Sequence, residues 1–209
     1  MDSFGHDHSH DHPHQSDDKI HAYYQILGQA LKELLIEKGI VSASEIQYAM
    51  ERREATTPAN GAKVVARAWL DSEYRKRLFM DANSAAAEFG IELPTTHLVA
   101  LENTPKIHNV VVCTLCSCYP RDLLGLPPAW YKSKAYRSRV VCEPREVLKE
   151  FGTLLPDDVE VRVHDSTADL RYLVVPMRPD DTDDLGEDAL RSLITRDTMI
   201  GVALAGRTI

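Results

Sequence analysis

The sequence predicts an α+β fold, in which an N-terminal helical arm precedes a layered α/β globular domain with short strands. Two observations lead to this prediction. From Ile20 to about residue 92, apolar residues recur at the spacing of amphipathic helices. After Pro94 the period changes, and short apolar runs rich in β-branched residues, which are typical of strands, take over. We therefore expect three parts, namely a disordered tail at 1–19, a helical arm at 20–92 and an α/β domain at 93–209.

A series of helices is predicted in the arm. Apolar residues with helical spacing begin at Tyr23, and Gly39 marks the end of the first helix. Ser42 and Glu45 form a capping-box pattern, which predicts the start of a second helix that runs to about Glu54. The stretch TTPANG interrupts the pattern. Further helices are expected at 62–70, 72–80 and 83–89.

Strands and helices are both expected in the α/β domain. The expected strands are the runs LVAL (98–101), VVVC (110–113), VEVRV (159–163) and LRYLVVP (170–176). Helices are expected near 144–151 and 187–194. This mixture of short elements favours layers of helix and sheet around one core.

Composition and charge exclude several classes of function. The net charge is −8, and no cluster of Lys and Arg is flanked by aromatic residues, so we expect no nucleic-acid partner. No apolar run approaches the roughly 18 residues of a membrane span, so we expect no membrane association. The N-terminus lacks the apolar core of a signal peptide, which favours a cytoplasmic location.

The first residues of the chain are rich in histidine. His6, His8, His10, His12 and His14 alternate with polar residues and Pro, a composition that cannot form a core. The segment is interpreted either as a solvated tail or as a loose binding and delivery site for a divalent transition metal, which imidazole binds well.

Three of the four cysteines are clustered in the run VVVCTLCSCYP, at Cys113, Cys116 and Cys118. This clustering suits metal binding better than a disulfide framework. If the thiolates of Cys116 and Cys118 bind one metal together with the amide nitrogens of Ser117 and Cys118, fused chelate rings favour a plane of two sulfurs and two nitrogens. Cys113 then reaches one axial position, and the opposite position stays open. Deprotonated amide ligands require a strongly Lewis-acidic ion, which points to a trivalent first-row metal.

The spacing alone leaves alternatives open. The three cysteines also fit a tetrahedral zinc site with His108 or Cys142 as the fourth ligand, part of an iron–sulfur cluster, or thiols without a metal. Cys142 stands apart from the others in the sequence and is predicted to be a free, buried thiol.

The wider sequence resembles one enzyme family. The run HNVVVCTLCSCYP, continued by LGLPPAWYKSKAYRSRVV, is similar to the metal-binding stretch of nitrile hydratase α subunits. Upstream, GAKVVARAWLDSEYRKRL resembles the helical segment of the family. Downstream, EPREVLKEFG, DSTADLRYLVVPMRP and LITRDTMIGV resemble its C-terminal half. The resemblance covers roughly residues 30–203.

The resemblance implies a lyase that hydrates a nitrile to the amide. It implies that the axial ligand is Cys113, that Cys116 becomes a sulfinic acid and Cys118 a sulfenic acid, and that the amides of Ser117 and Cys118 complete the site. The catalytic residues would then be Cys118, Cys116 and Ser117. Thr114, where iron-containing members usually carry Ser, favours Co(III) over Fe(III). Family members are heteromers, so the resemblance also implies a β subunit, as one chain or split into two, and a cobalt-insertion activator as a further partner.

The chain departs from the family immediately after the cysteines. Many members carry Trp-Pro where this chain has Arg121 and Asp122, and the charged pair predicts a polar nitrile as substrate. Arg121 also resembles the corresponding subunit of thiocyanate hydrolase, which is the alternative prediction, and a nitrile hydratase for a large polar nitrile, similar to the toyocamycin enzyme, is a third. Asp165 and Arg171 are expected to support the site from outside it. A competing class is a protein that binds or transfers cobalt without catalysis.

Overall fold

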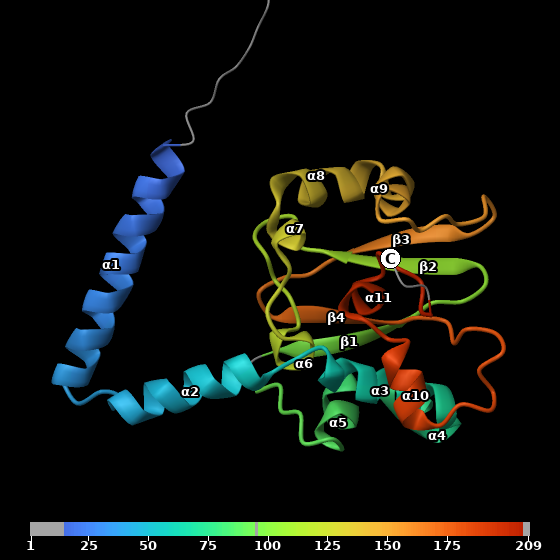
Figure 1. The fold of residues 1–209 in the computed structure, drawn as a ribbon, viewed down its shortest axis with the longest axis horizontal. Helices are drawn as coiled ribbons and strands as arrows, with labels where there is room; N and C mark the ends of the chain where they lie inside the picture. The colour runs from blue at the N-terminus through green and yellow to red at the C-terminus, as the bar shows by residue number, and fades with distance from the viewer. Residues whose placement is uncertain (1–14, 95, 207–209) are drawn as a thin grey trace, which may run out of the picture. The chain divides into compact units, whose positions relative to one another are not determined.

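A computed structural model describes residues 15–94 and 96–206 of the chain (Figure 1). The described residues fall into two compact units, one up to Glu51 and one from Arg52 on. The predicted His-rich metal site at His6–His14 lies outside the described residues. None of the described helices has both the length and the apolar character needed to cross a membrane.

The first unit contains the predicted first helix and the start of the second. α1 spans Gln15–Glu37, so the helix begins within the segment expected to be a tail. α2 spans Ala43–Ala55. The predicted capping box is confirmed, because the amide of Glu45 donates to Ser42 Oγ at 3.1 Å while the amide of Ser42 donates to Glu45 Oε2 at 2.8 Å.

Three helices that were assigned to the arm pack within the second unit. These helices are α3 (Ala59–Leu70), α4 (Ser72–Met80) and α5 (Ala82–Ala87), and a single residue separates each of them from the next. Asp71 and Asp81 cap α4 and α5 through their side chains. α3 buries Val64, Val65 and Ala66 completely, and this buried face explains why the unit boundary falls at Glu51 and not at residue 92.

All four predicted strands are confirmed, and they form two parallel pairs. β1 (His97–Glu102) pairs with β4 (Leu170–Val175), and β2 (Ile107–Val112) pairs with β3 (Glu160–Asp165). A short turn with a bridge between Thr104 and Ile107 connects β1 to β2. The parallel register of β2 and β3 places Val112 beside Asp165, so both strands deliver their last residues to the same end of the pair.

The remaining helices surround the strands (Figure 1). α8 and α9 lie near β3, α10 lies near α3, and α11 packs on β2 and β4. The sequence pattern predicted α9 and α10 but not the others. The bounds are α6 (Arg121–Leu124), α7 (Ala129–Lys132), α8 (Lys134–Cys142), α9 (Pro144–Glu150), α10 (Glu187–Ser192) and α11 (Arg196–Ile200).

One close contact fixes α11 against β2. Gly201 follows α11 with φ of 89°, the left-handed region that favours glycine. A Cβ atom at this position would lie 1.9 Å from the carbonyl oxygen of Asn109 in β2. The backbones can approach this closely only because residue 201 has no side chain.

Candidate metal centre

The cysteine loop, residues 113–118, begins where β2 ends. Because β3 runs parallel to β2, Asp165 at its end reaches the loop. Its carboxylate accepts hydrogen bonds from the amide of Thr114 at 2.9 Å and from the Thr114 hydroxyl at 2.5 Å. The supporting role predicted for Asp165 therefore has a definite contact, which anchors the first half of the loop.

Residues from α7 and α8 hold the loop from the other side. The Tyr131 hydroxyl donates to the Cys118 carbonyl at 2.8 Å, and the Tyr136 hydroxyl donates to the Val111 carbonyl at 2.7 Å. Arg137 donates to the Thr114 carbonyl at 3.2 Å. Sequence reasoning missed these three side chains as site residues, although they lie in the stretch AWYKSKAYRSR that was singled out for its family resemblance.

The three sulfur atoms converge. Cys113 Sγ lies 3.4 Å from Cys116 Sγ, and Cys116 Sγ lies 3.2 Å from Cys118 Sγ. The three Sγ atoms lie within 4.8 Å of one another. With a metal–sulfur bond of about 2.3 Å, two sulfurs at a right angle are separated by about 3.3 Å and two at a tetrahedral angle by about 3.8 Å. The observed spacings therefore fit a tetragonal or octahedral ion better than a tetrahedral one.

Hydrogen bonds within the loop also involve the backbone. The amide of Cys116 donates to Cys113 Sγ at 3.3 Å. Hydrogen bonds from the thiols of Cys118 and Cys113 lower the pKa of Cys116 to about 7, and the amides of Ser117 and Cys118 contribute to this shift.

The exposure of the sulfurs increases along the loop and then falls. Cys113 is buried, Cys116 is exposed and Cys118 is partly buried. Burial, together with the hydrogen bond to Cys116, raises the pKa of Cys118 to about 12, although the positive charge of Arg171 acts in the opposite direction. Cys116 is therefore the sulfur that loses its proton first in this pair.

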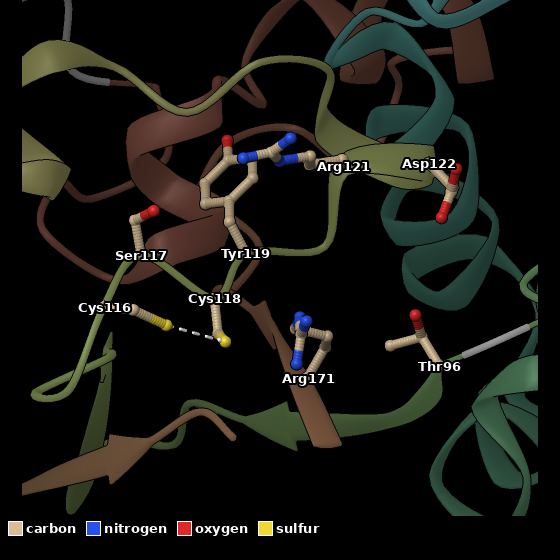
Figure 2. Close-up of a pocket in the computed structure, with 8 residues that line it drawn as sticks. All are labelled: Thr96, Cys116, Ser117, Cys118, Tyr119, Arg121, Asp122 and Arg171. Carbon is tan, nitrogen blue, oxygen red and sulfur yellow. Dashed lines mark hydrogen bonds between the residues drawn. The ribbon is translucent and has the colours of Figure 1, made fainter. Parts of the chain in front are cut away.

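A cavity of about 310 Å³ opens beside the loop (Figure 2). Arg171 enters it from β4, and Arg121 and Asp122 enter it from α6. The complete lining is Thr96, Cys116, Ser117, Cys118, Tyr119, Arg121, Asp122 and Arg171. The structure therefore brings Arg121, Asp122 and Arg171 to one cavity with two of the cysteines, while Asp165 lies on the far side of the loop at Thr114.

The residues considered as a fourth zinc ligand do not join the cluster. His108 is buried, with Nδ1 3.2 Å from Asn103 Nδ2 and Nε2 2.7 Å from the Gly201 carbonyl, so both ring nitrogens have partners. Cys142 ends α8 and is exposed, which corrects the prediction of a buried thiol: its position on the helix faces solvent instead of the core. In the described part of the chain, the metal-ligating cluster at this site consists of the three cysteines.

Comparison with known proteins gives the family. The model of the nitrile hydratase α chain matches residues 22–203. The chain belongs to this family. The match spans both the cysteine loop and the elements that hold it.

Individual relatives agree with the family model. The chain is 49% identical over 178 residues to the α subunit of the low-molecular-weight cobalt-containing nitrile hydratase of Rhodococcus rhodochrous, covering 84% of this chain and 86% of that protein. It is 43% identical over 193 residues to the γ subunit of thiocyanate hydrolase from Thiobacillus thioparus, covering 87% and 79%. Among solved structures, a recombinant thiocyanate hydrolase comprising partially modified cobalt centres superposes with a TM-score of 0.83 at 42% identity, covering 89% and 91%.

Proposed function

We propose that this member of the nitrile hydratase α-chain family is the catalytic subunit of a cobalt enzyme that hydrates a polar nitrile to its amide. One observation carries the proposal: the three sulfurs converge at spacings that fit a tetragonal or octahedral ion, beside a cavity with charged walls. The relative from Rhodococcus rhodochrous that is 49% identical to this chain is a cobalt-containing nitrile hydratase subunit.

Five atoms of the loop would hold the ion, namely the Sγ atoms of Cys113, Cys116 and Cys118 and the amide nitrogens of Ser117 and Cys118. We propose Co(III), with Fe(III) as the less favoured ion, because Thr114 follows the first cysteine. When bound, such an ion supplies Lewis acidity, which makes a nitrile carbon more electrophilic or bound water more acidic.

The loop residues then supply the proton chemistry. We propose that an external oxidant such as dioxygen converts Cys116 to a sulfinic acid and Cys118 to a sulfenic acid, which places oxygens beside the cavity. The sulfenate oxygen of Cys118 acts either as a base that takes a proton from the attacking water, or as a nucleophile that attacks the nitrile carbon and is then restored by water. Overall, one water is consumed: its oxygen becomes the carbonyl oxygen, and its two hydrogens end on the amide nitrogen.

Arg121 and Asp122 are proposed to select the substrate. Both line the cavity, and within the described part of the chain neither has an ion-pair partner. Their charges are therefore available to polar groups of a substrate, and an apolar nitrile would leave them without compensation. Arg171 adds a second cation on the side of Cys118.

Replacing Arg121 and Asp122 with Trp and Pro tests this selection. Asp122 lies in the first turn of α6, where proline is tolerated, so the double variant fits the backbone. We expect the ratio of kcat/KM for small apolar nitriles to that for polar nitriles to rise by about tenfold, the effect of about 1.4 kcal/mol. The measurement is a panel of nitriles of equal size, and unchanged relative rates would contradict the assignment.

A thiocyanate hydrolase is the second candidate, because Arg121 and Arg171 place two cations in the cavity and thiocyanate is an anion. The structural match to thiocyanate hydrolase is also high. A third possibility is a protein that binds or transfers cobalt without turnover, for which the His-rich tail provides the sequence support.

A partner subunit is part of the proposal. Leu115 in the cysteine loop is 89% exposed, and α1 exposes Leu27, Leu31 and Leu34 along one side. Apolar side chains at such positions favour a covering protein. We propose a β subunit, present as one chain or as two, and a cobalt-insertion activator.

Activity measured on the complex with its partner, produced with and without cobalt, separates these candidates. The proposal predicts that amide forms from a nitrile and that its formation depends on cobalt. Preferential consumption of thiocyanate would support the second candidate, and binding of cobalt without either reaction would support the third.

A further inference from the structure

We propose that Tyr131 is a positioning residue for Cys118: its hydroxyl fixes the end of the cysteine loop and thereby the backbone position from which the Cys118 sulfur projects. The inference rests on the proposed function, in which that sulfur takes part in the reaction. It concerns a residue that the sequence did not single out as part of the site.

Tyr131 is itself held rigidly. Its side chain is fully buried. Its ring packs edge-on against Tyr119 and Trp130, with centroid distances of 5.2 and 5.9 Å, and lies at 5.8 Å from Tyr136. A buried ring among three aromatic neighbours has little freedom to move. The position of its hydroxyl is therefore determined by the fold of α7 and α8.

The hydroxyl contacts the backbone of a cysteine directly. It donates to the Cys118 carbonyl oxygen at 2.8 Å. The carbonyl carbon, the amide nitrogen and Cβ of Cys118 are all attached to one Cα, so holding the carbonyl restricts rotation about the Cα–C bond and fixes where the amide nitrogen and Cβ lie. Both Sγ and the amide nitrogen of Cys118 are proposed ligands.

The other contacts to the loop act elsewhere. Tyr136 holds Val111 before the loop, and Asp165 and Arg137 hold Thr114. Cys118 is the last residue of the loop, and its sulfur contacts Cys116, which is exposed. Without the hydrogen bond from Tyr131, the backbone of Cys118 would be less restricted at its carbonyl group.

The test compares Tyr131→Phe with a matched variant, Tyr74→Phe, in the complex made with its partner and cobalt. Tyr74 is also buried, and its hydroxyl donates to the Ala85 carbonyl at 3.1 Å, on a different part of the unit. We measure the cobalt content, the sulfur-to-cobalt charge-transfer absorption, kcat and KM. Tyr131→Phe is expected to lower kcat by about tenfold and to shift the absorption, with KM within about twofold. Tyr74→Phe should leave all four unchanged.

A second arm uses the complex made without added cobalt. The rate at which iodoacetamide alkylates Cys118, followed by peptide mass spectrometry, is expected to rise about fivefold in Tyr131→Phe relative to Tyr74→Phe, because the loop end is released. If Tyr131→Phe equals Tyr74→Phe in both arms, the inference is overturned. If the wild-type complex binds no cobalt, the proposed function fails instead, and the alkylation rates alone decide whether Tyr131 positions Cys118.

Discussion

Asp165 connects the sheet to the cysteine loop, since it ends β3 and holds Thr114 in the loop through two hydrogen bonds. Such an arrangement restricts the loop before any ligand binds, which lowers the entropy lost when ligand atoms are ordered around an ion. The pairing of β2 with β3 is therefore a requirement of the site as well as of the fold.

The variant Asp165→Ala should bind less cobalt than wild type and melt at a lower temperature. Loss of hydrogen bonds at this exposed residue costs about 1 kcal/mol, which corresponds to about 2–4 °C. Cobalt content per chain and thermal unfolding are the measurements. Asp158→Ala, which removes only the surface pair with Lys106, is the matched control and should change neither. Equal cobalt content in the two variants would show that Asp165 does not hold the loop.

The turn between β1 and β2 is organised by a buried polar network. Asn103 Oδ1 accepts from the Asn109 amide at 2.8 Å, and Asn103 Nδ2 lies 3.2 Å from His108 Nδ1. Because an amide nitrogen only donates, His108 accepts at Nδ1 and donates from Nε2 to the Gly201 carbonyl. Asn109 Oδ1 extends the network to His164 Nε2 at 2.8 Å. The network requires His108 in its neutral form.

Burial lowers the pKa of His108 below its ordinary value of 6.5, although the hydrogen bond to Gly201 acts in the opposite direction. Below about pH 6.5 the His108 imidazole is therefore protonated in the unfolded chain but stays neutral in the folded chain. The free energy of unfolding should fall as the pH drops through this range. The pKa of His164 is also lowered, mainly by burial, and has the same sign. We expect a loss of about 1 kcal/mol between pH 7.5 and pH 5.5.

Urea unfolding at the two pH values measures this loss. His108→Gln should reduce the pH dependence, whereas a Gln substitution of the exposed His97 on β1 should leave it as in wild type. A pH dependence that is the same in all three proteins would mean that another group is responsible.

Local patterns predicted most of the elements and the sulfur ligands. The strands and the longer helices have clear periods, and the cysteines are neighbours in the sequence. α6, α7 and α11 are too short to show a period, and α8 has no clear apolar face. These elements were missed because their stability comes from packing on the rest of the unit.

Long-range contacts could not be predicted in the same way. Tyr131 and Arg137 meet the cysteine loop only because α7 and α8 fold back beside β2, and Asp165 meets Thr114 only through strand pairing. These contacts join residues that are far apart in the sequence, so no local spacing predicts them. Arg121 was found because a family resemblance drew attention to it, and the cavity shows what it faces.

At the scale of the whole molecule, each level of the structure converges on the cysteine loop. The parallel pair of β2 and β3 places its first end, α7 and α8 hold its backbone, and one cavity gives access to Cys116 and Cys118. The exposed Leu115 indicates that a partner completes this surface. The central claim is that this loop is an oxidised cobalt site.

The mass of the tryptic peptide 107–121, which runs from the residue after Lys106 to Arg121 and holds all three loop cysteines, tests that claim most directly. The protein is produced with its partner and cobalt, and the metal content is determined on the same sample. We expect about one cobalt per chain, with two added oxygens on Cys116, one on Cys118 and none on Cys113. A peptide of unmodified mass, from protein that contains zinc, would contradict it.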